Sequence, residues 1–258
     1  FYIASLLGVQ YFHHTIALEA PQFSDLIFLK FVILAGIFFG LLALLLIELM
    51  KITKRAFALI NDNLLRAAIG GLILLLLTIP FSTTYLGLGT EQIESAVKGQ
   101  PQEKGGFLLK MLFTSITLAS GGSGGVIGPI FFVGASAGSL FAEIFKANIS
   151  LFAGIGIVAL LAAATNTPIA AAIMAIELFG PQIGVFAALA AFVSFIIVGH
   201  KSIYPSQVIG AKKSDSLQVT GRDVREAKVD ISSKGQGVLH EVYRKVNIPV
   251  IRFRRKRY

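Results

Sequence analysis

The sequence predicts an all-α integral membrane protein, and three observations carry this prediction. The 258-residue chain is 55% hydrophobic and only 14% charged, whereas soluble domains carry roughly 25% charged residues. Apolar runs recur from residue 26 to residue 199 and approach the roughly 20 residues of a spanning helix. Several runs are short or interrupted. The composition argues against a soluble enzyme domain, and the absence of cysteine excludes disulfides and thiolate metal sites.

The apolar segments are expected to follow one another as helices. Leu26–Met50 and Leu64–Phe81 have the length of full spans, and Pro80 closes the second. The later segments are Phe107–Ser120 (interrupted by Lys110), Val126–Phe145, Leu151–Gly180 (divided at Thr165–Pro168) and Gln182–Gly199. Broken helices survive at membrane depth only where they pack in protein or line a site, and small residues allow close approach. These features indicate a transporter or channel.

The positive charge is concentrated after the last apolar segment. Residues 207–258 hold 13 Lys/Arg and 5 Asp/Glu, a net +8 of the formal +9. A basic flank after membrane helices is typical of a cytoplasmic segment near anionic lipid, and it lacks the pattern of a nucleic-acid reader. We therefore expect a membrane domain over 1–210, a basic cytoplasmic tail over 211–258, and no nucleic-acid partner. The expected location is the cell (inner) membrane.

The most informative motif lies between two apolar segments. It reads Gly121-Gly122-Ser123-Gly124-Gly125-Val126-Ile127-Gly128-Pro129. Proline suits the first turn of a helix, and glycines let the preceding backbone fold tightly with its N–H groups exposed. A helix that starts inside a membrane presents free N–H groups and a positive dipole end, which together make an anion site. The motif holds no Lys or Arg, which suits an ion that must be released quickly.

Four segments together resemble the CLC family of chloride channels and proton-coupled anion antiporters. Gly124–Pro129 is similar to the family's GxFxP motif. Ala163–Ala170, running on to Glu177–Gly180, resembles its broken helix pair. His200–Tyr204 resembles the segment that delivers an anion-binding tyrosine, and Gly87–Thr90 resembles the glycine-rich entry to a short helix. Their order and spacing match the second half of that fold, from residue 1 to about residue 210.

The resemblance implies both a fold and a function. The fold would be the broken and re-entrant helices of the second inverted repeat of a CLC subunit. The function would be transport of a small inorganic anion, chloride by default, by a homodimer in a lipid bilayer, without enzymatic activity or a cofactor. The implied anion-binding residues are Val126, Ile127, Gly128 and Tyr204, and the implied motif residues are Gly124, Gly125 and Pro129.

Departures from the family pattern leave finer points open. Ile127 stands where the family has Phe, so a fluoride-exporting antiporter stays an alternative to a chloride transporter. The family's GSGIP serine and GREGP gating glutamate have no counterpart in these residues, so channel and proton-coupled antiporter both stay open. The chain starts inside an apolar run without a signal peptide, and we expect it to be part of something longer. Reconstituted alone, these 258 residues are expected to move no more anion than protein-free liposomes.

An intramembrane serine protease is the alternative from another class. Gly121-x-Ser123-x-Gly125 and Gly134-x-Ser136-x-Gly138 both fit the G-x-S-x-G pattern, with His200 as a base. The pattern needs a strand-to-helix turn, however, and such strings are common in Gly/Ser-rich membrane helices. Covalent labelling of Ser136 by a fluorophosphonate would support the protease.

Other polar residues are assigned structural or solvated roles. Glu177 is expected to make structural hydrogen bonds near the end of a helix, and Glu91 and Glu94 to form a solvated helix end. The histidines have no metal-ligand spacing, so no metal is expected; they are His13, His14, His200 and His240.

Overall fold

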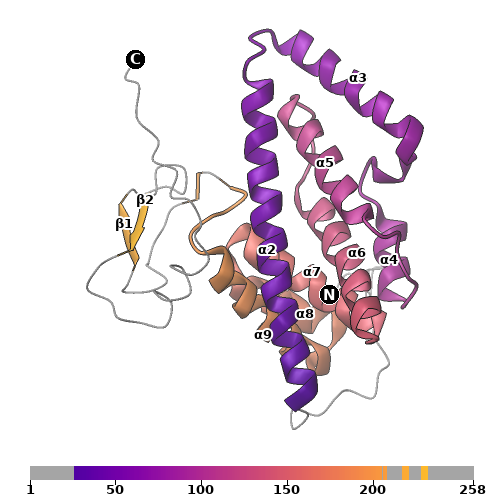
Figure 1. Ribbon diagram of the computed structural model, residues 1–258, viewed down its shortest axis with the longest axis vertical. Helices are drawn as coiled ribbons and strands as arrows, with labels where there is room; N and C mark the ends of the chain where they lie inside the picture. The colour runs from indigo at the N-terminus through magenta and orange to yellow at the C-terminus, as the bar shows by residue number, and fades with distance from the viewer. Residues whose placement is uncertain (1–25, 205, 208–216, 221–227, 232–258) are drawn as a thin grey trace, which may run out of the picture. The chain divides into compact units, whose positions relative to one another are not determined.

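A computed structural model describes residues 26–204, 206–207, 217–220 and 228–231, and the chain divides into two compact units, Phe1–Ile203 and Tyr204–Tyr258. The described part of the first unit is helical (Figure 1). Its elements are α2 (Leu26–Phe57), α3 (Asn63–Phe81), the 3-10 turn η1 (Thr83–Tyr85), α4 (Thr90–Val97), α5 (Gly106–Ala119), α6 (Ile127–Phe145), α7 (Ile149–Thr165), α8 (Pro168–Phe179) and α9 (Pro181–Val198). The predicted apolar segments and the predicted break at Thr165–Pro168 are thereby confirmed.

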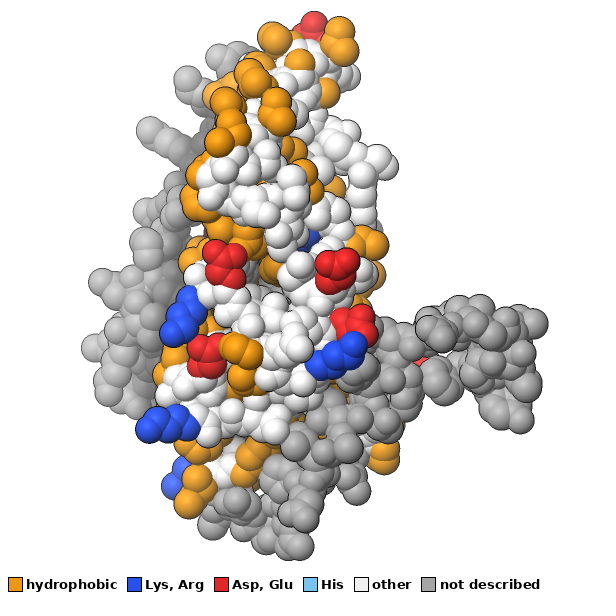
Figure 2. Space-filling view, turned by 90° about the vertical axis from the view of Figure 1, so that its right-hand side faces the viewer, with side chains coloured by type: hydrophobic (Ala, Val, Ile, Leu, Met, Phe, Trp, Pro, Cys, Tyr) orange, Lys and Arg blue, Asp and Glu red, His pale blue; other side chains and the backbone are white. Residues whose placement is uncertain are grey.

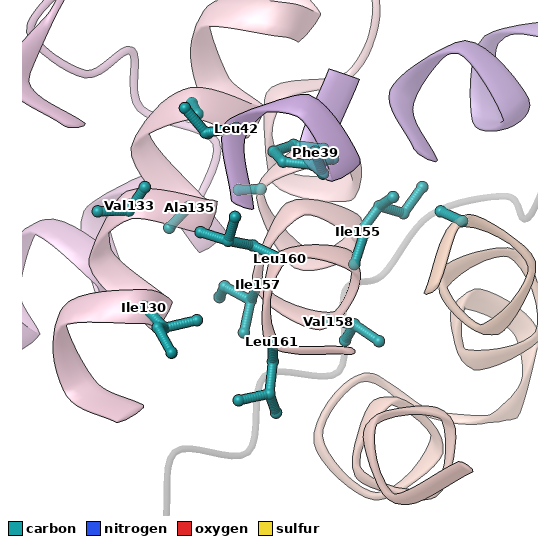
Figure 3. Packing of buried hydrophobic residues seen from close by; sticks show 14 of the residues in the cluster. Phe39, Leu42, Ile130, Val133, Ala135, Ile155, Ile157, Val158, Leu160 and Leu161 are labelled. Atoms are coloured by element: carbon teal, nitrogen blue, oxygen red, sulfur yellow. The ribbon is translucent and has the colours of Figure 1, made fainter. Parts of the chain in front are cut away.

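Helix α7 is the centre of the first unit. Every residue from Leu151 to Thr165 is buried, and α6, α9, α2 and α8 all contact this helix. Figure 3 shows Ile155, Ile157 and Leu160 of α7 beside Phe39 of α2, with residues of α6 close by. A helix that is apolar on all sides has to be enclosed, and α7 is enclosed by other helices of the same chain.

Glycines bring the central helices into backbone contact. A Cβ built on Gly134 of α6 would lie 2.6 Å from the carbonyl oxygen of Gly156 in α7, and one on Gly138 would lie closer still to the Phe152 carbonyl. On α2, a Cβ at Gly36 would lie 2.9 Å from the Ala190 carbonyl of α9. Small residues at such crossings are typical of membrane helices, where close packing replaces the hydrophobic driving force.

Helix α3 carries its apolar side chains on the outside. Leu64, Leu75 and Ile79 are 79%, 63% and 78% exposed, and Figure 2 shows hydrophobic side chains gathered over the end of the molecule where α3 lies. Within the described residues, α2, α3 and α6 are long and apolar enough to cross a membrane. An exposed apolar helix of this kind is stable in lipid, where its surface meets hydrocarbon chains.

Helix α2 extends beyond the predicted end at Met50 to Phe57, with Lys54 and Arg55 in its last turn. Basic side chains there complement the negative end of the helix dipole. Glu48 near this end accepts from Lys201, which follows α9, with an Nζ–Oε1 distance of 2.9 Å. This ion pair joins the first described helix of the membrane domain to the segment that follows its last helix.

The described part of the second unit contains one antiparallel hairpin. Strand β1 (Leu217–Thr220) pairs with β2 (Lys228–Ile231) in the register Leu217↔Ile231. No strand was predicted in this basic segment, because four-residue strands leave little alternation to recognise. The predicted division of the chain at residue 210 stays a prediction.

Candidate anion site at the start of helix α6

The glycine-rich motif forms an exposed link between α5 and α6. The Ser120 N–H donates to Ile116, and the Gly122 N–H donates back to the Thr117 carbonyl at 2.9 Å. Gly121 between them has a φ of +99°, a backbone conformation that residues other than glycine rarely adopt. The backbone therefore reverses direction sharply after α5 and leads through Gly124 and Gly125 into α6.

The start of α6 presents backbone donors without acceptors. Val126 is the N-cap and makes no side-chain cap bond. Among the described residues, the N–H groups of Val126, Ile127 and Gly128 donate to none, while Ile130 is the first to donate into the helix, to the Val126 carbonyl. Pro129 has no N–H to satisfy. Ile127 is 49% exposed, so this helix start is accessible and carries the positive end of a dipole.

A second glycine-rich segment lies against this helix start. Gly87 and Gly89 both have positive φ, and Gly89 caps α4. Leu88 between them covers Gly128, since a Cβ built on Gly128 would lie 2.8 Å from Leu88 Cδ2. A Cβ on Gly89 would collide with the Phe132 ring. The link before α4, predicted only as a helix entry, therefore also packs on the first turns of α6.

The break between α7 and α8 creates another helix start. Asn166 adopts a left-handed φ of +63°, and Thr167 donates back to the Ala162 carbonyl at 3.1 Å. The hydroxyl groups of Thr165 and Thr167 are hydrogen bonded to each other, with an oxygen–oxygen distance of 2.6 Å. Pro168 then begins α8, as proline does at a first helical position. The predicted break is thus a turn held by local hydrogen bonds.

The end of α7 lies beside the start of α6. The two helices are antiparallel, with Gly134 against Gly156 and Gly138 against Phe152, and Figure 3 shows Ile130 and Leu161 at the same end of the pair. Ile203 donates its N–H to the Ala164 carbonyl at 2.8 Å. This bond brings the segment that leads to Tyr204 to the same end of the membrane domain as the α6 start.

Tyr204 itself opens the second unit and is 40% exposed. The other six predicted site residues are consecutive in the chain and lie at the start of α6: Gly124, Gly125, Val126, Ile127, Gly128 and Pro129. For Tyr204, the structure shows only that the preceding residue, Ile203, is hydrogen bonded to Ala164. The contact of the tyrosine hydroxyl with an anion stays a prediction.

Lys110 is the residue near this site whose role the sequence did not show. Its side chain is 1% exposed, and its Nζ donates to the carbonyls of Tyr85 and Gly87 at 3.1 and 2.7 Å. From the sequence Lys110 only interrupts an apolar run. The sequence feature that could have pointed to Lys110 is that it is the single charged residue of that run, because charged residues inside a membrane mark functional positions.

The other assigned carboxylates lie on helix surfaces. Glu94 pairs with Lys98 at 2.5 Å, and Glu91 is exposed in the first turn of α4, as the prediction of a solvated helix end requires. Glu177 is also exposed. Within the described residues its carboxylate makes no hydrogen bond, and the helix end at Gly180 is closed by its own backbone. The structural role expected for Glu177 stays a prediction.

The structure gives one of the two G-x-S-x-G strings a packing role. Gly134 and Gly138 lie inside α6, where they allow contact with α7, and Ser136 between them is 5% exposed. The string that contains Ser123 lies in the link before α6. A nucleophile elbow needs a strand that turns into a helix, and both strings have helices or a helix link around them.

The chain is similar in sequence to known proteins. Residues 2–199 match the family described as voltage gated chloride channel. A chloride/fluoride channel protein of Pseudomonas syringae pv. tomato is 36% identical over 80% of this chain and 47% of its own length. A voltage-gated ClC-type chloride channel, ClcB, of Escherichia coli is 31% identical over 58% of this chain and 38% of its own length.

A solved structure shows the same arrangement of helices. The crystal structure of a CLC-type fluoride/proton antiporter superimposes with a TM-score of 0.74 and 30% identity, over 79% of this chain and 52% of that one. The chain thus spans about half the length of the relatives it matches. The fold is that of an all-α membrane protein, and the chain belongs to the voltage-gated chloride channel (CLC) family.

Proposed function

We propose that this chain forms part of a membrane protein that moves a small inorganic anion, with chloride and fluoride as the candidate ions. The observation that supports this most is the accessible start of α6, where the N–H groups of Val126, Ile127 and Gly128 have no acceptor among the described residues. N–H donors without acceptors at the positive end of a helix dipole are suited to an anion.

The chemistry of the site suits passage better than tight retention. The motif from Gly121 to Pro129 has no charged side chain, so an anion there would meet partial charges only. Conduction requires binding that is strong enough to admit the ion and weak enough to release it. The proposed fourth ligand is the Tyr204 hydroxyl, a neutral donor. The proposal includes no enzymatic step, cofactor or metal.

The experiment is anion efflux from liposomes that contain the full-length protein. Vesicles loaded with chloride or fluoride are diluted into anion-free buffer with valinomycin and potassium, and the released ion is followed with a selective electrode. Release well above that from protein-free vesicles is expected for at least one of the two ions. Background release of both ions would contradict the proposal.

The same vesicles distinguish a channel from an antiporter. An outward anion gradient would draw protons inward through an antiporter, and external pH would rise without an added proton gradient. A channel would release the anion at constant pH. The solved structure with the same helix arrangement is that of a fluoride/proton antiporter, and this likeness favours the coupled mechanism. We therefore propose a rise in external pH together with anion release.

Partners and orientation extend the proposal. A homodimer in an inner (cell) membrane is proposed on the family resemblance, with a cytoplasmic tail that approaches anionic lipid. The cluster Arg252–Arg257 that motivates the last point lies outside the described residues, and each basic residue close to such a surface contributes about 1 kcal/mol.

Tail orientation is testable by labelling. A cysteine placed at Ser233, in a chain that has none of its own, should react with a membrane-impermeant maleimide only after the cells are opened. Labelling of intact cells at the rate of opened ones would contradict a cytoplasmic tail.

A further inference from the structure

Lys110 buries a charge in the membrane domain without a carboxylate partner among the described residues. It lies in α5 with 1% of its surface exposed. The ion pairs found in the described part of the chain involve Lys51, Lys98, Lys104 and Lys201, and Lys110 is in none of them. A buried ammonium is costly unless it is hydrogen bonded or paired, so such a residue needs a reason to be present.

The partners of Lys110 lie in α6 or in the segment that packs on the first turns of α6. Its Nζ donates to the Tyr85 and Gly87 carbonyls and lies 5.0 Å from the centroid of the Phe132 ring, a cation–π distance. Phe132 belongs to α6, five residues after Ile127. At 1.5 Å of rise per residue this separation is roughly 8 Å along the helix axis.

The segment that Lys110 holds continues directly onto the site. Gly87 accepts from Lys110, the next residue, Leu88, covers Gly128, and Gly89 approaches Phe132. Leu88 is 58% exposed, so few other contacts hold it in place. A continuous path therefore runs from the buried ammonium through one backbone segment to the residue whose N–H is proposed to bind the anion.

We propose that Lys110 is a positioning residue of the anion site: its ammonium holds the Tyr85–Gly89 segment on the first turn of α6 and adds a positive charge behind the N–H donors. This inference rests on the proposed function and deepens it. Neither carbonyls nor a ring neutralise a full charge, and screening inside the protein is weak. The anion thus contacts partial charges only, while the full charge of Lys110 stays out of contact behind the Tyr85–Gly89 segment.

The test is calorimetric titration of the full-length protein with chloride and with fluoride. Lys110→Met keeps the length of the side chain and removes the charge, so anion affinity should weaken by about tenfold or more. Lys110→Arg keeps the charge and should stay within about threefold of the wild type. Lys98→Met, at an exposed lysine just after α4, is the matched control and should leave affinity unchanged.

Each outcome decides between the proposals. A folded Lys110→Met protein with wild-type affinity would overturn the role of Lys110, even if its melting temperature fell, because that result indicates a purely structural lysine. A wild-type protein that binds and moves neither anion would instead overturn the proposed function. If Lys110→Met does not fold, Leu88→Ala replaces it, since this exposed side chain can be removed without touching the buried charge. Weaker affinity is expected there too, and wild-type affinity would contradict the proposal.

Discussion

Replacing Gly138 with alanine is expected to cost the protein about 3 kcal/mol of stability or more. The added Cβ would meet the Phe152 carbonyl and the backbone of Ala153 on α7. Both obstacles are main-chain atoms of a fully buried helix, so no side chain can rotate away, and α6 and α7 would have to separate. Thermal unfolding in detergent, followed by circular dichroism, measures the loss.

The matched control makes the same change where there is room. A Cβ on Gly71, inside α3, meets nothing within 4 Å, and alanine is favoured over glycine in a helix by roughly 0.5–1 kcal/mol. Gly71→Ala should therefore unfold at the wild-type temperature or slightly above it. Equal melting temperatures for the two variants would show that α6 and α7 do not meet at Gly138.

Replacing Tyr204 with phenylalanine is expected to weaken anion affinity by about one to two decades. The change removes one hydroxyl donor and keeps the ring, and a hydrogen bond to a charged group contributes roughly 1.5–3 kcal/mol. The backbone donors at Val126 and Ile127 are untouched, so binding should persist in weaker form. Calorimetric titration of the full-length protein with chloride and fluoride gives the two dissociation constants. Tyr204→Ala should go further and loosen proton coupling if the protein is an antiporter.

Tyr85→Phe is the control for this prediction. The Tyr85 hydroxyl donates to the Glu103 carboxylate, and Tyr85 is 3% exposed. Loss of that bond should lower the melting temperature and leave anion affinity unchanged, because the backbone carbonyl that holds Lys110 stays in place. If Tyr204→Phe retained wild-type affinity for both anions, Tyr204 would be an interfacial residue and not part of the site.

The local features of this protein were predictable from the sequence because short-range chemistry controls them. Helix ends followed from glycine, proline and the length of each apolar run, and α3 and the break at Thr165–Pro168 were predicted within a few residues. The start of α6 was equally local: glycines before it, Pro129 inside it, and no side chain to cap it. The end of α2 was predicted too early, because Lys54 and Arg55 lower the hydropathy without ending the helix.

Contacts between distant segments were decided by the tertiary structure alone. Composition marks Gly134 and Gly138 as small, but only the crossing with α7 shows that each faces a backbone carbonyl. Lys110 finds its acceptors 25 and 23 residues earlier in the chain, and Leu88 contacts Gly128, which lies 40 residues later. Periodicity and turn chemistry act over a few residues and determine which helices form, whereas the partner of a buried group depends on which helices pack together. The sequence by itself therefore determined the helices and the glycine-rich turn before α6, and the packing of α5 and of the Tyr85–Gly89 segment against α6 determined the surroundings of that turn.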